Sequence, residues 1–153
     1  MTRLGLTTSL EILIGDWLHR RDLKLVVAES CTGGLIGHLI TNVPGSSAYY
    51  LGSITAYAYS VKERILGVHP ETLLTHGAVS RATVLEMARG VRQSLGGEST
   101  LDKVIGLSVS GIAGPGGATP DKPVGLVWIG ISAPEGDFAW HFIGHGDRRE
   151  NKA

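Results

Sequence analysis

The hydrophobic positions near the start of the chain change between helical and strand spacing. After Ser9 the apolar residues recur at intervals of three and four, which predicts a helix with one buried face: Leu10, Leu13, Ile14, Trp17 and Leu18. Residues 23–28 (LKLVVA) are a short apolar run that predicts a largely buried strand. A polar segment, residues 29–34 (ESCTGG), comes next, and helical spacing then returns at Leu35, Ile36, Leu39 and Ile40. A strand, a tight turn and a helix are therefore expected around residue 30.

Further strands and helices alternate with loops through the rest of the chain. Residues 42–47 predict a loop, and residues 49–59 predict a strand rich in aromatic and β-branched side chains. Ser60 and Glu63 have capping-box spacing, which predicts a short helix from Ser60 to about Gly67. A helix is expected at residues 80–96, a strand at 104–110 and a glycine- and proline-rich loop at 111–123. Two further strands, at residues 125–132 and 138–143, are expected to form a hairpin with its turn at 134–136.

This order of elements favours one α/β domain over residues 1–153, with a mixed sheet covered by helices. The last two strands are too close in sequence for a crossover helix, so the sheet cannot be wholly parallel. Residues 146–149 (GDRR) read as a charged loop after the last strand, and we expect the domain to lack its final helix.

Composition and charge narrow the class of protein. Hydrophobic residues make up 42% of the chain and charged residues 18%, which is typical of a globular domain. The 14 basic and 14 acidic side chains balance, so no basic excess points to a nucleic-acid partner. One cysteine, Cys31, and the absence of a signal-like or membrane-spanning run favour a cytoplasmic location without membrane contact.

Ser30 is the first candidate for chemistry, because it lies between a buried strand and a helix expected to begin near Thr32. Unpaired N–H groups at such a helix end can stabilise an oxyanion or hold a phosphate. Gly33 and Gly34 would let substrate atoms approach the backbone. The simpler alternative is that Ser30 or Thr32 only caps the helix.

A nucleophilic serine needs a base, and Lys62 is the strongest candidate. It lies near the start of a short helix beyond a strand, where the helix dipole and burial favour a neutral amine. The alternative is a solvated surface lysine. The six histidines show no metal-ligand spacing. Tyr57, in the same segment, is suited to stacking on a flat ring or to hydrogen bonding, or is simply a half-buried aromatic of the strand.

Two other segments could contribute to a binding site. Residues 110–117 (SGIAGPGG) follow a strand, and their N–H groups could form an anion-binding nest, although they match neither a Walker loop nor a dinucleotide fingerprint. The guanidinium groups of Arg148 and Arg149 could bind a phosphate through paired hydrogen bonds, or the two residues could belong to a solvated terminal segment.

Together the motifs resemble the C-terminal domain family of the CinA proteins, the nicotinamide mononucleotide deamidases. The matching segments occur in family order and cover roughly residues 8–150: AESCTGG (28–34), VPGSS (43–47), Tyr57 with Lys62, ILGV (65–68), GAVS (77–80), GIAGPGG (111–117), KPVG (122–125) and GDR (146–148). The chain departs from the family pattern at Ala58-Tyr59, where Ser-Asn is usual, and at Ser110. Tyr59 stands where a side-chain amide is usual, and Ser110 stands where threonine is usual.

The resemblance implies a single-domain three-layer sandwich and hydrolysis of nicotinamide mononucleotide to nicotinate mononucleotide and ammonia. It implies Ser30 as nucleophile, Lys62 as its base, and Tyr57 as an active-site hydrogen-bonding partner. The residues expected to contact substrate are Ser47, Cys31, Thr32, Gly33, Gly34, Ser110, Gly111, Gly114 and Arg148. In the mechanism we expect, N–H groups of residues 31–34 hold the oxyanion.

No metal or other cofactor is expected, and the expected partner is a small nucleotide substrate. We also expect a homo-oligomer, with a dimer favoured. Three alternatives stay open: a nucleotide-binding module without turnover, a metal-dependent hydrolase that uses the histidines, and a partner protein in competence or the damage response.

Overall fold

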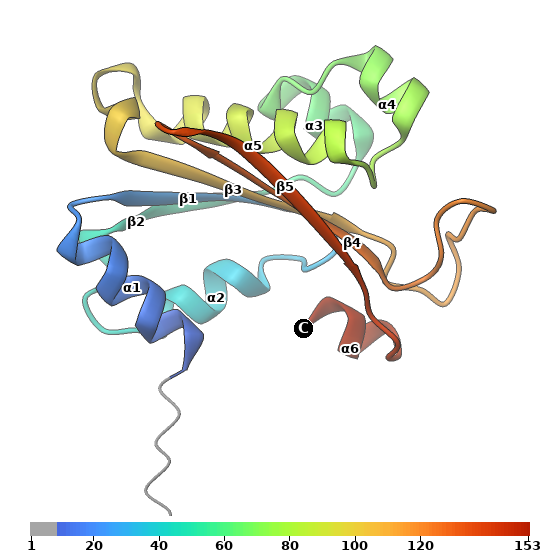
Figure 1. Ribbon diagram of the computed structural model, residues 1–153, viewed down its shortest axis with the longest axis horizontal. Coiled ribbons are helices and arrows are strands. Elements are labelled where there is room, and N and C mark those ends of the chain that lie inside the picture. The colour runs from blue at the N-terminus through green and yellow to red at the C-terminus, as the bar shows by residue number, and fades with distance from the viewer. Residues whose placement is uncertain (1–8) are drawn as a thin grey trace, which may run out of the picture.

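The computed structural model describes residues 9–153 as one five-stranded sheet between two layers of helices (Figure 1). Its strands are β1 (Lys24–Glu29), β2 (Tyr50–Thr55), β3 (Val104–Gly111), β4 (Leu126–Ala133) and β5 (Gly136–Ile143). Its α-helices are α1 (Leu10–Arg20), α2 (Leu35–Thr41), α3 (Tyr59–Leu66), α4 (Pro70–His76), α5 (Arg81–Gly96) and α6 (Arg148–Lys152). Two 3-10 turns, η1 (Ser46–Ala48) and η2 (Glu98–Lys103), complete the described elements.

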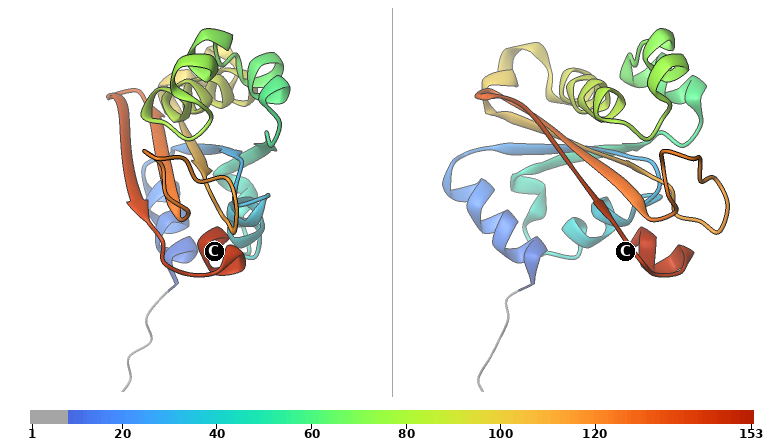
Figure 2. Two further views of the ribbon diagram at one scale, coloured as in Figure 1. Left: turned by 90° about the vertical axis from the view of Figure 1, so that its right-hand side faces the viewer. Right: turned by 45° about the vertical axis from the view of Figure 1, so that its right-hand side comes forward.

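The sheet is mixed, as expected, in the order β2-β1-β3-β4-β5. The first three of these strands are parallel, whereas β4 and β5 form an antiparallel hairpin. Helices α3, α4 and α5 cover one face, and α1, α2 and α6 lie on the other (Figures 1 and 2). The prediction of a single α/β domain with three layers is therefore confirmed.

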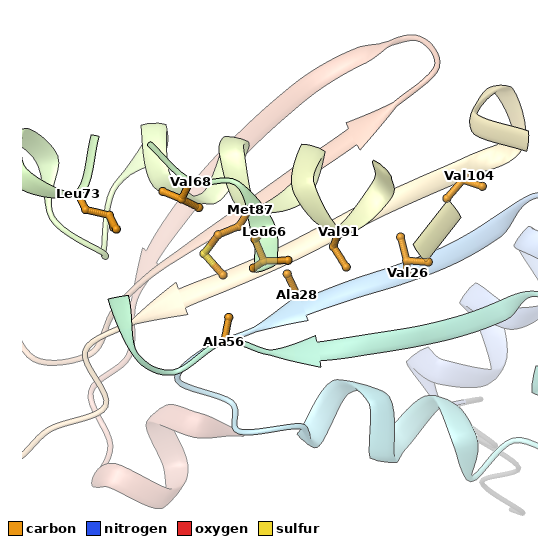
Figure 3. Packing of buried hydrophobic residues seen from close by; sticks show 9 residues of the cluster. All are labelled: Val26, Ala28, Ala56, Leu66, Val68, Leu73, Met87, Val91 and Val104. Atoms are coloured by element: carbon orange, nitrogen blue, oxygen red, sulfur yellow. The ribbon is translucent and has the colours of Figure 1, made fainter. Parts of the chain in front are cut away.

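The main core lies between α5 and the sheet (Figure 3). Met87 and Val91 of α5 pack against Val26 and Ala28 of β1, and all four side chains are fully buried. Because β1 is covered on both faces, its run of apolar residues does not alternate with polar ones. This interior strand leads into the candidate site.

Helices α3 and α5 cross closely, and the crossing requires a glycine in α5. A Cβ added at Gly90 would lie 1.8 Å from the carbonyl oxygen of Leu66. In an ordinary helix, Gly→Ala stabilises by about 0.5–1 kcal/mol. Here we expect Gly90→Ala to lower the free energy of unfolding by about 1–3 kcal/mol, because backbone must move to admit the methyl group. Urea denaturation measures the change, and a variant as stable as the parent would contradict this packing.

Several element boundaries differ from the sequence-based expectations. The strand expected at 49–59 ends at Thr55, because the chain turns out of the sheet and α3 already begins at Tyr59. The N-cap of α3 is Ala58, so the expected capping box of Ser60 and Glu63 does not form. Helix α4 was not expected, although Pro70 occupies its first turn, a position that proline favours.

The segment expected as a charged loop at 146–149 contains the start of a helix. The side chain of Asp147 accepts hydrogen bonds from the N–H groups of Arg149 and Glu150. Glu150 in turn accepts from the N–H of Asp147, which completes a capping box. Residues 148–152 are therefore the short helix α6, whose capping signal the sequence analysis overlooked.

Within the described residues, part of the face that β5 presents is not covered by a helix. Phe138, Trp140 and Phe142 alternate along β5 and are each about half exposed. An apolar groove of about 700 Å³ separates this region from α1. The expectation of a homo-oligomer stays a prediction. Among the described residues, no helix is long and apolar enough to span a bilayer.

Candidate functional site

The site forms where β1 ends. β1 is flanked by β2 and β3, both parallel to it, so three strand ends meet at one edge of the sheet. Ligand sites in such sheets lie at the carboxyl ends of the strands. Ser30 directly follows β1, its N–H donates to the carbonyl of Val109, and its side chain is buried. The strand pairing therefore holds the backbone of the candidate nucleophile.

The side chain of Lys62 extends from α3 toward Ser30 at the end of β1. It belongs to α3 and is almost fully buried, with 1% of its surface exposed. Its Nζ lies 3.0 Å from the Oγ of Ser30. The same Nζ donates to the carbonyl oxygens of Ala56 (2.6 Å) and Tyr57 (3.1 Å). The alternative of a solvated surface lysine is therefore wrong.

Burial also changes the acidity of this amine. Removal from water disfavours the charged ammonium, and the pKa of Lys62 falls from 10.5 to about 8. A neutral amine has two protons and one lone pair. The carbonyls of Ala56 and Tyr57 accept the two protons, so the lone pair is left for the hydroxyl proton of Ser30. The geometry suits proton transfer from serine to lysine.

Cys31, although adjacent to Ser30, is a weaker candidate for the nucleophile. Burial raises the pKa of its thiol above the usual value, so the reactive thiolate is disfavoured. Its side chain is buried beside Val109 and Val127.

A cavity of about 170 Å³ opens next to the Ser30–Lys62 pair. It is lined by Ser30, Cys31, Tyr57, Lys62, Ala78, Val79, Ser110, Gly111, Ala113 and Arg148. Most of the residues that the sequence analysis singled out therefore share one pocket. Ala78 and Val79 belong to the GAVS segment before α5 but were not predicted as site residues, because small apolar side chains carry no chemical signal.

Arg148 closes one side of this cavity. Its guanidinium donates to the hydroxyl of Tyr57 (3.1 Å) and to the carbonyl of Gly114 (2.6 Å). Asn151, one turn later in α6, donates to the carbonyl of Ala113. These bonds fasten α6 to the loop of residues 111–117. Gly114 thus shapes the site through its carbonyl, and Tyr57, which is largely exposed, forms the rim.

Three of the predicted contact residues line a neighbouring hollow instead. Thr32, Gly33 and Gly34 border a space of about 380 Å³, together with Leu35, His38, Arg149 and Lys152. Two of the lining side chains, Arg149 and Lys152, are cationic, and the hollow is open to solvent. It adjoins the Ser30 cavity through the turn of residues 30–34.

Ser47 does not lie near Ser30 within this chain, so its expected contact with substrate stays a prediction. Ser47 lies in η1, which leads into the amino end of β2, and the neighbouring Tyr49 carbonyl bonds to Leu25 at the start of β1. Because β1 and β2 are parallel, this is the edge of the sheet opposite to Ser30. Ser47 is exposed there, and it does not line the cavity.

The start of α2 also differs from expectation. The helix begins at Leu35 rather than near Thr32, and its first N–H groups bond to the buried carboxylate of Glu29. The N–H of Gly33 bonds to the carbonyl of Ser30. The N–H groups of Cys31 and Thr32 face the sulfur of Cys31, and within the described residues no backbone oxygen accepts from them. The expected oxyanion donors at 31–34 are therefore reduced to these two.

The surroundings of the pair offer no metal centre. Among the residues whose side chains the structure describes, no three of histidine, cysteine, aspartate or glutamate come together in a group that could hold a metal ion. Tyr59, a departure from the family pattern, begins α3, and its hydroxyl accepts from the N–H of Ala78 at 3.3 Å.

Comparison with known proteins agrees with this picture. Residues 7–153 match the family described as "CinA C-terminal domain". A CinA-like protein of Salinibacter ruber is 54% identical over 112 residues, which are 73% of this chain and 26% of that protein. A CinA-like protein of Chlorobaculum tepidum is 46% identical over 149 residues, covering 94% of this chain and 34% of the relative. The chain thus spans about a quarter to a third of these relatives.

Solved structures show the same fold. A competence-damaged protein (CinA) superfamily protein from Enterobacter cloacae has a TM-score of 0.86 at 29% identity, over 99% of this chain and 89% of that one. The competence/damage inducible protein CihA from Agrobacterium tumefaciens has a TM-score of 0.82 at 38% identity, over 93% and 84% of the two chains.

Proposed function

The chain belongs to the CinA C-terminal domain family, and from this premise we propose that it is an amidohydrolase that converts nicotinamide mononucleotide to nicotinate mononucleotide and ammonia. The family includes nicotinamide mononucleotide deamidases. The observation that carries the proposal is the 3.0 Å contact between Ser30 Oγ and a buried, weakly basic Lys62 amine beside a cavity. This pairing supplies both an activated nucleophile and a proton carrier.

In the first half of the reaction, the neutral Lys62 amine accepts the hydroxyl proton of Ser30. Oγ then attacks the carboxamide carbon, and the N–H groups of Cys31 and Thr32 stabilise the oxyanion. When the tetrahedral intermediate collapses, the carbon–nitrogen bond breaks, and Lys62 returns the proton to the departing nitrogen. Ammonia leaves, and a nicotinoyl ester remains on Ser30.

In the second half, Lys62 accepts a proton from water, and the resulting hydroxide adds to the ester carbon. The bond from carbon to Oγ then breaks, and the proton returns to Ser30. The product is nicotinate mononucleotide. Every proton transfer in the cycle uses the same amine, so no second base is required.

The size of the two spaces supports a split binding mode. The Ser30 cavity of about 170 Å³ is smaller than the usual pocket for a whole ligand, which suits the pyridine ring alone. The ribose phosphate then extends into the neighbouring hollow, where Arg149 and Lys152 provide positive charge. Tyr57 at the rim offers a flat surface to the ring.

An ammonia-release assay tests the function directly. We expect the purified protein to release one ammonia for each nicotinate mononucleotide formed, at a rate unchanged by excess chelator. Loss of activity with chelator would favour a metal-dependent hydrolase. Tight binding of the nucleotide without ammonia release would reject the amidohydrolase proposal in favour of a binding module.

A further inference from the structure

Glu29 is a fully buried carboxylate at the end of β1, immediately before Ser30. Its Oε2 accepts hydrogen bonds from the hydroxyl of Thr32 (2.6 Å) and from the N–H groups of Gly34 (3.0 Å) and Ile36 (3.1 Å). Its Oε1 accepts from the N–H of Gly37 at 2.9 Å. A buried charge is costly unless it is fully bonded, and these four donors satisfy it. The carboxylate therefore holds the whole turn from β1 to α2.

This arrangement does more than cap a helix. The N-cap residue of α2 is Gly34, which has a φ of +99° and no side chain that could cap the helix. The cap comes instead from Glu29, on the far side of the turn. The end of β1 and the first turn of α2 are thereby tied to one group, with Ser30, Cys31 and Thr32 held between them.

Glu29 acts on the geometry of the turn and not on the charge of the lysine. Burial is the main cause that lowers the pKa of Lys62, and the hydrogen-bond partners of its amine are Ser30 and the carbonyls of Ala56 and Tyr57 rather than Glu29. Glu29 does not line the Ser30 cavity either. Its influence on the reaction must therefore pass through the backbone of residues 30–34.

We propose that Glu29 is a positioning residue, which sets the turn so that Ser30 Oγ meets Lys62 Nζ and the N–H groups of Cys31 and Thr32 are left for the oxyanion. By bonding the N–H groups at the start of α2, the carboxylate also removes them from competition for the substrate. This inference rests on the proposed amidohydrolase function.

Glu29→Gln is the direct test, with Glu86→Gln as its matched control. The amide nitrogen of glutamine is a donor, so it must face one of the N–H or O–H donors of the turn. Glu86 also holds the start of a helix, because its carboxylate accepts from His69 N–H and Thr72 Oγ1 at α4, away from the site. Thr32→Val is a milder variant that removes only the hydroxyl donor to Glu29.

For Glu29→Gln we expect kcat to fall roughly 10- to 100-fold, because small misplacements of reacting groups are costly. KM should stay within about twofold and the pH limb near 8 should not move, since neither the cavity lining nor the amine changes. Amide hydrogen exchange should rise at residues 34–37. Glu86→Gln should keep the parent kcat and exchange faster at residues 69–72, and Thr32→Val should lower kcat less than Glu29→Gln.

A parent-like kcat per folded molecule in Glu29→Gln, or a shifted pH limb, would overturn the inference. A serine-directed fluorophosphonate separates it from the proposed function. If the parent releases no ammonia but Ser30 is labelled, the function fails, and slower labelling in Glu29→Gln than in Glu86→Gln supports the positioning role. Equal labelling overturns that role, and an unlabelled parent overturns both.

Discussion

Replacing Ser30 by alanine is expected to lower kcat for ammonia release by about 10³-fold or more, the scale of loss seen when a serine nucleophile is removed. The methyl group of alanine fits where the hydroxyl group was, so the cavity and the fold should persist. KM for the nucleotide should change little, because binding of the ring and phosphate uses other residues. Steady-state ammonia release, together with the unfolding curve of each protein, measures both effects.

Ser108→Ala is the matched control for this experiment. Ser108 is also a fully buried serine, on the neighbouring strand β3, and its hydroxyl donates to the carbonyl of Val84 rather than to a cavity group. We expect it to retain the parent kcat even if its stability falls. If Ser30→Ala kept more than about a tenth of the parent rate, a serine nucleophile would be ruled out.

Lys62→Met is expected to cause a comparable loss of kcat, about 10³-fold, while it keeps the length and apolar stem of the side chain. The parent should show a matching pH dependence. Below pH 8 the amine of Lys62 is mostly protonated and cannot accept the proton of Ser30. The rate should therefore rise with pH through about 8 and then level off, because the pKa of Lys62 is lowered to about 8.

The profile of kcat/KM against pH, from 6 to 10, tests this assignment. Lys122→Met is a suitable control, because Lys122 donates to the carbonyl of His76 outside the Ser30 cavity. It should keep the parental limb near pH 8. The assignment fails if the residual activity of Lys62→Met still rises through the same pH. Because Lys62→Met leaves two carbonyl groups without a donor, rates should be compared per folded molecule.

The sheet and its order could largely be anticipated from local patterns. The apolar run at β1, the spacing in α1 and α5, and the short turn between β4 and β5 each carry a strong signal, and each element was found close to its expected bounds. The helix expected from about Ser80 begins at Arg81, and the side chain of Ser80 caps it by accepting from the N–H of Thr83. These features depend on residues that are close together in the sequence, so local patterns are enough to predict them.

Element ends that depend on distant partners were harder to place. The aromatic and β-branched residues of segment 49–59 favour a strand throughout, but the amine of Lys62 bonds the carbonyls of Ala56 and Tyr57 and holds them outside the sheet. Likewise, the helix after Ser30 begins at Leu35 rather than near Thr32, and the carboxylate of Glu29 bonds the N–H groups at its start. Side-chain bonds across the fold decided both boundaries.

The candidate site was predicted in part for the same reason. Ser30 and Lys62 were paired from the resemblance of their motifs, and the structure places their atoms in contact. Ser47 belongs to an equally recognisable motif, yet strand direction puts it at the opposite edge of the sheet. Glu29 was overlooked because a glutamate in a polar turn resembles any solvated residue until its burial is known.

The tight crossing of α5 over the end of α3 has a consequence for the acid–base chemistry. Leu66, whose carbonyl touches the bare face of Gly90, is one helical turn from Lys62 on the same short helix. A small tilt of that helix would admit water around the amine and raise its proton affinity, because exclusion from water is what weakens it as a base. In the proposed mechanism, the packing of α3 against α5 therefore sets the pH at which Lys62 can accept the proton of Ser30.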